Sequence, residues 1–378
     1  MRKLAVAFCA LLTVYSAGWV HLARHRPAAL IGLDVRYHPL DASLEVTSIV
    51  PGGAAGKAGL EPGDRIRSVD GQPLSTYEPF LAMRRAARPG VPIRVAGTRG
   101  GRPLALAVVP DQPLGPSPSV TTSLLGRLRL GTVVLQLLTF YPLPFLIVAV
   151  TVLLQRPEDG RAWLLAVMLG GFIASAPLPD LEYGIPAGIR GPMFAFWILL
   201  FLPLAAVTYA FFGVFPAHSP LDRRVPWLKW AAVGASMAVA VPLAVALWRA
   251  GGSEALAWLS DRFPAYQPAA AAVFGLYNFV FFVLAMVSLA LNAFGPPDVR
   301  RKTRVILFGM LVGTLPLLTL QLAAAVLRVP LERIPFGAWA VSILALFAIP
   351  LSLGYAVVKH RAMEIPVLLR RSARGIGA

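Results

Sequence analysis

Carboxylates and cysteine are scarce in this chain of 378 residues. It has 18 Asp and Glu against 35 Lys and Arg, and charged residues of all kinds make up only 14%. Cys9 is the one cysteine, so no disulfide forms within the chain and no metal is held by several of its thiolates. Hydrophobic residues make up 57% and the mean hydropathy is +0.68. This composition argues against a soluble enzyme and favours a membrane protein.

Eight apolar runs approach the roughly 20 residues that a helix needs to cross a bilayer. They lie near residues 4–23, 130–154, 162–178, 192–215, 227–248, 267–294, 305–327 and 335–358. The first run follows Arg2 and Lys3 but has no clear small-residue cleavage site after it. We therefore interpret it as an uncleaved anchor.

Lys and Arg fall mostly between these runs, and their distribution predicts a topology. If the N-terminus is cytoplasmic and all eight runs span, the inside segments hold 16 Lys and Arg. The short outside loops hold only Arg190, Arg249, Arg262, Arg328 and Arg333. Cytoplasmic loops retain positive charge during insertion. Both termini are therefore predicted to be cytoplasmic, and residues 24–129 to lie outside the cytoplasm.

That outer stretch has the pattern of a small folded domain. Alternating Val, Ile and Leu predict strands at "LIGLDVRY", "SLEVTSIV", "DRIRSV", "VPIRVAG" and "PLALAVV". One helix is predicted at Ala54–Ala58, ended by Gly59, and a second from Ser75 to about Ala87. For the second helix, "STYE" is typical of a capping box. Asp70-Gly71 and Gly100-Gly101 predict tight turns.

The run "VTSIVPGGAAGKAGLEPGDRIRSVDGQPL", with the helix, "RPG" and two strands that follow, resembles the PDZ domains of bacterial HtrA-type and other envelope proteases. The resemblance implies a partly open β-barrel with two helices. The predicted fold class is a membrane all-α bundle of about eight transmembrane helices with an inserted small extracytoplasmic α+β PDZ domain. The predicted divisions are an anchor (1–26), the PDZ domain (27–111), a linker (112–129), a seven-helix region (130–358) and a basic cytoplasmic tail (359–378).

The same resemblance implies peptide capture by strand addition. A peptide or protein C-terminus would pair with "IGLDVRY", and its carboxylate would lie in a nest of backbone N–H groups. The implied groove residues are Leu30, Ile31, Gly32, Leu33, Phe80, Leu81 and Arg84. Their apolar members suit a core equally well. Arg84 is expected outside core packing, although an exposed arginine on a helix is commonly just solvated.

The patterns of intramembrane proteases and transporters are missing. None of the five histidines, His21, His25, His38, His218 and His360, lies in H-E-x-x-H, the helical pair that binds zinc. Ser236 has no His or Lys in the central part of a predicted span to activate it, and the spans lack Asp. Gln136, Asn278, Asn292 and Gln321 are typical of interhelical hydrogen bonding rather than an ion path. We therefore expect no enzymatic activity, no metal and no cofactor.

A second resemblance covers most of residues 130–372. "FFGVFPAHSPLDRRVPWLKW", "RRKTRVILFGMLVGTLP" and "IPLSLGYAVVKHRAMEIPVLLRRS" are similar to the membrane input regions of some bacterial sensor histidine kinases and PP2C-type phosphatases. In those proteins a catalytic region follows the last span, whereas this chain stops at Ala378. Two possibilities stay open: an input module whose output belongs to a partner, and a shortened version of a longer sensor.

The sequence thus predicts a multi-pass protein of the bacterial inner membrane with a periplasmic PDZ domain that serves signal input. The expected partners are a peptide or protein C-terminus, the lipid bilayer and a cytoplasmic kinase or phosphatase, and no nucleic acid. Two alternatives remain. One is a membrane scaffold or adaptor that holds a client protein or protease, and the other is an intramembrane-protease homologue that lacks catalytic residues.

Overall fold

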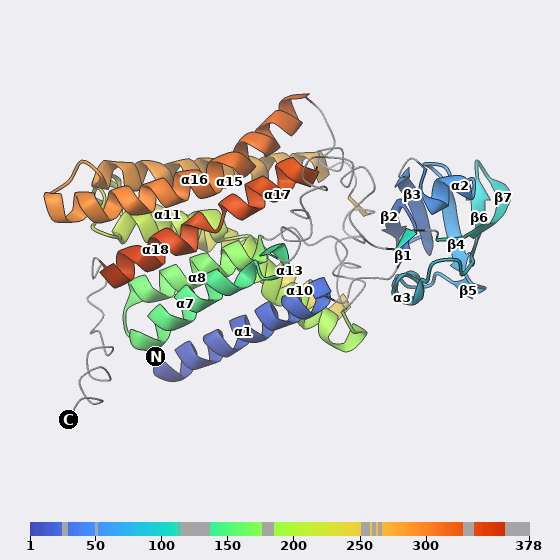
Figure 1. The fold of residues 1–378 in the computed structure, drawn as a ribbon, viewed down its shortest axis with the longest axis horizontal. Coiled ribbons are helices and arrows are strands. Elements are labelled where there is room, and N and C mark those ends of the chain that lie inside the picture. Colours follow the sequence, from blue (N-terminus) through green and yellow to red (C-terminus); the bar gives the residue numbers. More distant parts are fainter. Residues whose placement is uncertain are drawn as a thin grey trace.

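A small strand-rich domain lies beyond one end of a bundle of long helices (Figure 1). The computed structural model describes residues 1–24, 29–49, 52–110, 112–113, 137–175, 185–250, 258, 262–263, 267–327 and 336–359. The predicted linker from residue 114 onward and the predicted tail from residue 360 onward lie outside the described residues, as do His25, Gln136 and His360.

The strand-rich domain, residues 29–113, is built on an antiparallel sheet of order β2-β3-β4-β6-β7, with β5 paired to β4. Its strands are β2 (Leu33–His38), β3 (Ser43–Ile49), β4 (Arg65–Val69), β5 (Gln72–Pro73), β6 (Ile93–Arg99) and β7 (Arg102–Val108). A separate ladder joins β1 (Ala29–Leu30) to β8 (Gln112–Pro113), so the two ends of the domain lie side by side. The five predicted strands are confirmed. The predicted boundaries at 27 and 111 stay predictions.

Of the two short helices of this domain, one lies where it is predicted and the other begins later. Helix α2 (Ala54–Lys57) is confirmed, and Gly59 follows it at φ +88°, a left-handed conformation that glycine adopts without steric cost. Helix α3 (Glu78–Ala86) begins three residues later than predicted, with no side-chain cap at its start. The reason is Pro79, which fits the first turn of a helix but would remove a hydrogen bond from the interior of one that began at Ser75.

A buried carboxylate ties the turn before β4 to the end of β6. The side chain of Asp64 is 1% exposed, and it accepts hydrogen bonds from Arg99 Nε at 2.7 Å and from the Glu61 backbone N–H at 2.8 Å. Arg99 also donates to the carbonyl of Gly59. The hydrogen bond from Arg99 is the main reason why the pKa of Asp64 lies below its ordinary value.

This pair predicts how the strand-rich domain responds to acid. Because the pKa of Asp64 is lower in the folded than in the unfolded chain, its contribution to stability is complete above the unfolded pKa. It is lost as the pH falls below about 4. We expect amide hydrogen exchange in β3, β4 and β6 to accelerate over that range. Asp64→Asn should weaken the domain at neutral pH and reduce its response to acid; an unchanged acid response would contradict this account.

The remaining helices form the bundle together with α1 (Arg2–Arg24). They are α7 (Pro142–Gln155), α8 (Gly160–Ala174), α10 (Ala187–Phe201), α11 (Leu204–Val214), α12 (Pro220–Arg224), α13 (Leu228–Ala250), α15 (Gln267–Asn292), α16 (Pro297–Leu327), α17 (Phe336–Ala345) and α18 (Ala348–Lys359). Among the described residues, each predicted apolar run overlaps at least one helix.

The prediction of eight spans is not confirmed. Within the described residues, five helices are long and apolar enough to cross a membrane, and a sixth span results if α10 and α11, bent by 44°, are taken together. The apolar helices Gly160–Ala174 and Val341–Val357 are shorter. Proline explains two of the breaks: Pro203 separates α10 from α11, and Pro350 lies in the first turn of α18, just after the break from α17.

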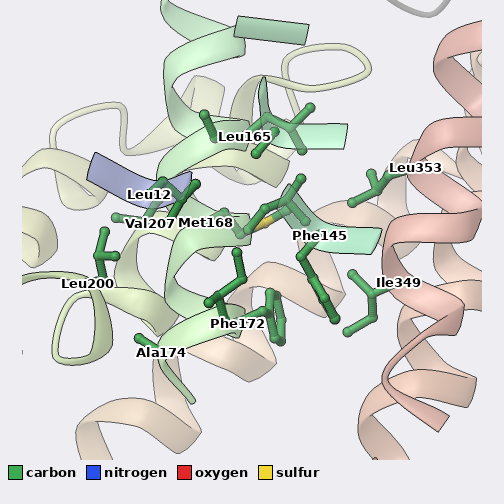
Figure 2. Packing of buried hydrophobic residues seen from close by; sticks show 14 of the residues in the cluster. Leu12, Phe145, Leu165, Met168, Phe172, Ala174, Leu200, Val207, Ile349 and Leu353 are labelled. Atoms are coloured by element: carbon green, nitrogen blue, oxygen red, sulfur yellow. The ribbon is translucent and has the colours of Figure 1, made fainter. Parts of the chain in front are cut away.

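The bundle has a continuous apolar core in which the first helix takes part. Figure 2 shows Leu12 of α1 near Met168 of α8, with Phe145 of α7 facing Ile349 and Leu353 of α18. All five side chains are at most 1% exposed. A Cβ at Gly170 would lie 3.4 Å from both Leu12 and Leu200, at the edge of ordinary van der Waals contact, so α1 and α10 both pack against α8 at this point. The N-terminal helix is therefore packed into the bundle.

Candidate functional site

Strand β2 forms one edge of the main sheet. In the part of the chain that the structure describes, its one partner strand is β3. Leu33 and Tyr37 are buried and Val35 is partly buried, whereas Asp34 and Arg36 point to solvent. One face of β2 is thus fixed by the core, and the edge opposite β3 has the form that accepts an additional strand.

Helix α3 lies beside the C-terminal end of β2. The Tyr37 hydroxyl donates a hydrogen bond to the Ser75 carbonyl at 3.0 Å. The Tyr37 ring stacks on Tyr77 and the Tyr77 ring stacks on Phe80, with ring centroids 5.5 Å apart in each pair. These contacts hold the first turn of α3 against β2.

The loop before β2 contains a residue in the left-handed conformation, which is one element of an anion nest. Gly32 adopts φ +74°, in the left-handed region. The Ile31 carbonyl accepts a hydrogen bond at 2.8 Å from the backbone N–H of Ala55, at the start of α2. A left-handed residue in a short loop can turn neighbouring N–H groups toward one point, where a carboxylate can accept from them.

The seven residues predicted for the groove come from β1, the loop that follows it, β2 and α3, and the structure places most of them in one core. Ile31, Leu33, Phe80 and Leu81 are between 0% and 6% exposed and belong to the hydrophobic cluster of the domain. Gly32 is half-buried, and Leu30 belongs to β1, where its backbone pairs with Gln112. Whether these residues bind a peptide stays a prediction.

Arg84 corrects the sequence-based expectation. It was expected outside core packing, but it is only 7% exposed, and its guanidinium lies 5.9 Å from the centroid of the Phe80 ring. The long apolar stem of arginine and the attraction of its charge to an aromatic face allow such burial. Arg84 is therefore buried beside Phe80 of α3.

A charged cluster of the bundle has no counterpart in the sequence analysis. Asp222 of α12 is 2% exposed, and its carboxylate lies 2.6 Å from Lys229 Nζ and 2.9 Å from His218 Nδ1. The Lys229 side chain is 8% exposed. The motif Ser219-Pro220, in which Ser219 caps α12 by accepting from the Asp222 backbone N–H, was the available signal. In the topology prediction, Lys229 is one of the 16 Lys and Arg assigned to the inside segments.

A second missed contact joins the strand-rich domain to the bundle. Nη1 of Arg190, in the first turn of α10, lies 2.7 Å from Oε2 of Glu78 in the first turn of α3. Two residues more than a hundred positions apart cannot be paired from sequence patterns. Among the described residues, no group of three or more His, Cys, Asp or Glu is placed to hold a metal ion.

Residues 45–94 match the PDZ-domain family. One similar protein is the regulator of sigma-E protease RseP of Escherichia coli, 37% identical over 89 residues that make up 24% of this chain and 19% of that protein. A putative zinc metalloprotease of Rhizobium meliloti is 36% identical over 89 residues, 23% of each chain. The periplasmic pH-dependent serine endoprotease DegQ of Escherichia coli is 32% identical over 66 residues, 18% of this chain and 14% of that protein.

The matched segment is a PDZ domain, which confirms that part of the resemblance. The chain spans about a fifth of the length of the first two relatives. The resemblance of residues 130–372 to sensor input regions is not shown, and a sensor role gains no support from these relatives. The apolar helices and the relatives indicate a protein of the bacterial inner membrane.

The expectation of a chain without enzymatic activity is contradicted by these names. RseP, the zinc metalloprotease and DegQ are all named as proteases, and they point to an enzyme family through the PDZ segment. The expectation was wrong because a missing sequence motif excludes only the mechanism that needs that motif.

Proposed function

We propose that this membrane protein uses its PDZ domain to capture extended peptides or protein C-termini, and that it thereby selects client proteins for proteolysis at the membrane. The observation that carries the proposal is the edge of β2, which lies beside α3 and follows the left-handed Gly32. PDZ domains in general bind peptides and C-termini. The link to proteolysis is supported by the relatives, which are named as proteases.

In this proposal, main-chain hydrogen bonds along β2 supply affinity and the loop at residues 30–33 selects a free carboxylate. A client whose C-terminus lies at that loop runs antiparallel to β2, with its upstream residues passing toward Tyr37. Phe80, Leu81 and Arg84 would line the pocket for its last side chains. Small adjustments of the buried side chains would open that pocket, as is common when domains bind ligands.

The domain is proposed to lie outside the cytoplasm, with both termini of the chain inside. The excess of Lys and Arg in the proposed inside segments supports this orientation. Asp222 pairs with Lys229 and so neutralises one positive charge of the proposed inside segments. The excess of positive charge in these segments remains.

A second candidate is a scaffold or adaptor that holds a client or a protease at the membrane. This candidate is favoured because the similarity is confined to the PDZ segment. The matched segment makes up less than a quarter of each of the relatives above. Capture is common to both candidates. The two candidates predict different results when a bound client is incubated with the purified protein alone. A protease would cut the client, and a scaffold would leave it intact.

Peptide capture can be tested with the full-length protein in lipid nanodiscs and a library of peptides with free or amidated C-termini. We expect binding of the free form and loss of about tenfold or more in affinity on amidation, because the nest would lose a charged acceptor. Equal binding of the two forms would remove the nest from the proposal, and binding of neither would overturn capture.

Gly32→Ala should reduce the affinity for the best free peptide by about tenfold, because a Cβ strains the left-handed backbone on which the nest depends. Gly100→Ala is the matched control, since Gly100 has φ +53° in the turn between β6 and β7, away from the groove. Both variants carry backbone strain, but only the first should affect binding. If both variants lost affinity to the same extent, backbone strain and not the nest would explain the loss.

A further inference from the structure

Exposed tryptophans mark two levels along helix α13. Trp230 lies in its first turn and Trp248 in its last, and both side chains are more than half exposed. They are 18 positions apart, which is about 27 Å along a helix. The hydrocarbon core of a bilayer is about 30 Å thick, and tryptophan is enriched at its two faces. Helix α13 therefore fits a single crossing with an exposed tryptophan at each face of the membrane.

The two levels lie at opposite ends of the bundle. Trp248 belongs to the end beside the strand-rich domain, because a Cβ at Gly191 would meet its carbonyl at 2.5 Å and the neighbouring Arg190 contacts Glu78 of α3. Trp230 belongs to the other end. In Figure 1 the turn between α15 and α16 and the N-terminus lie at that end, remote from the strands.

Buried polar contacts fix the corner between α12 and α13 at this remote end. Asp222 of α12 pairs with Lys229 of α13 at 2.6 Å, and both side chains are less than a tenth exposed. The Asn292 side chain, at the end of α15, donates to the carbonyl of Ala217 just before α12 at 2.9 Å. Helix α16 begins at Pro297, only five residues after Asn292. The corner and the start of α16 therefore lie close together.

Four exposed arginines gather on these two segments. Arg223 and Arg224 belong to α12, and Arg300 and Arg304 belong to the first turns of α16. Among the side chains that the structure describes, no carboxylate forms an ion pair with any of the four. Positive charge near the start of a helix is opposed by the helix dipole, so Arg300 does not serve to stabilise α16. The positive charge of this surface is thus left for an external anion.

One face of α16 changes from cationic to apolar along its length. Arg300, Arg304 and Phe308 follow one another at intervals of four residues, so they share a face of the helix. All three are exposed, Phe308 by 70%. Leu311 and Leu315, one and two turns further along, are exposed as well. A phospholipid has the same order of chemistry, with a charged headgroup at the surface and apolar chains beneath it.

We propose that Arg300 and Arg304 bind the phosphate of an anionic phospholipid headgroup whose acyl chains lie along Phe308. The planar guanidinium suits a phosphate because it presents two N–H groups side by side. Arg223 and Arg224 add to the positive potential that attracts such a lipid. The exposed Trp227 and Trp230 place the whole surface at headgroup level. This proposal is independent of peptide capture and of which face of the membrane is cytoplasmic.

The occupant is a lipid rather than a soluble anion or an acidic protein because of the apolar half of the face. A free phosphate would use the arginines and leave Phe308 without a role. An acidic segment of a soluble protein would have to enter the apolar level of the membrane to reach Phe308. A membrane lipid meets both halves from the position that it already occupies.

The test measures lipid binding to the full-length protein in a neutral detergent. Phosphatidylglycerol and phosphatidylcholine with the same acyl chains are titrated separately, and native mass spectrometry gives the affinity for each. We expect phosphatidylglycerol to bind about tenfold more tightly or better, because each arginine near an anionic headgroup contributes about fivefold. Equal affinities for the two lipids would overturn the proposal.

A pair of matched variants locates the site. Arg300→Gln combined with Arg304→Gln should bring the two lipids to within about threefold of each other. The control combines Arg67→Gln with Arg102→Gln, which removes the same charge from two exposed arginines of the PDZ sheet and should keep the full preference. Both proteins should unfold at the wild-type temperature in neutral detergent, since all four side chains are exposed. A full preference in the first protein, or an equal loss in the control, would exclude this site.

Competitors separate the lipid from the other anions. Glycerol 3-phosphate carries a phosphate without acyl chains, and a peptide of ten glutamates carries charge without either. We expect neither to displace bound phosphatidylglycerol at a hundredfold molar excess. Displacement by glycerol 3-phosphate would make the surface a site for a free phosphate, and displacement by the peptide would make it a face for an acidic protein. Either result would overturn the lipid assignment.

Discussion

Asp222→Ala should lower the stability of the bundle by about 3–5 kcal/mol, because it leaves the buried Lys229 ammonium without its carboxylate. Lys229 Nζ lies 2.6 Å from Asp222 Oδ1, and both side chains are less than a tenth exposed. The substitution also removes the carboxylate that His218 Nδ1 contacts. Thermal unfolding of the protein in a mild detergent measures the effect.

A double variant shows whether the unpaired charge is the cause. Asp222→Ala combined with Lys229→Met removes both charges and should recover most of the lost stability. Asp159→Ala is the control for loss of a carboxylate that is only partly buried: Asp159 caps α8 by accepting from the Arg161 backbone N–H, and its loss costs about 1 kcal/mol. If the double variant were as unstable as Asp222→Ala alone, the ion pair would not explain the effect.

Gly309→Ala should separate α16 from α18. A Cβ at Gly309 would meet the Ala348 carbonyl at 2.8 Å and would also collide with the Ser352 side chain. Gly313, one turn further along α16, lies against Ile349 in the same way. Forcing an atom into such a contact costs about 1–3 kcal/mol or more, since backbone cannot move aside as a flexible side chain can. We expect a lower unfolding temperature in detergent.

Gly275→Ala is the matched control for this substitution. Gly275 lies within α15, and a Cβ there would meet no atom within 4 Å. Alanine forms helices more readily than glycine, so this variant should be neutral or slightly stabilised. A Gly309→Ala protein as stable as the Gly275→Ala protein would show that α16 and α18 are not held by close contact at this point.

Local patterns sufficed for much of the PDZ domain. The five strands and α2 follow from alternating apolar residues and from Gly59, because these signals act within a few residues of chain. The start of α3 was misjudged because the "STYE" pattern was weighted above Pro79, although the effect of Pro79 is equally local.

The sequence predicts where the apolar runs lie, but it does not predict which of them are single helices long enough to cross a membrane. Hydropathy measures how apolar a segment is, whereas Pro203 and Pro350 decide where a helix can continue. The groove residues illustrate a similar limit: Ile31 and Leu81 suit a core and a pocket equally, and burial shows only that they belong to the core of this structure.

Composition, periodicity and turn chemistry predict a membrane protein with a small strand-rich domain, because each depends on neighbouring residues alone. The motif at residues 46–74 adds the resemblance of that domain to PDZ domains. The pairing of Glu78 with Arg190 and the burial of Asp222 with Lys229 emerged only from the folded chain. A charge looks the same in a sequence whether it is solvated or paired, and only packing in three dimensions removes it from water and selects its partner.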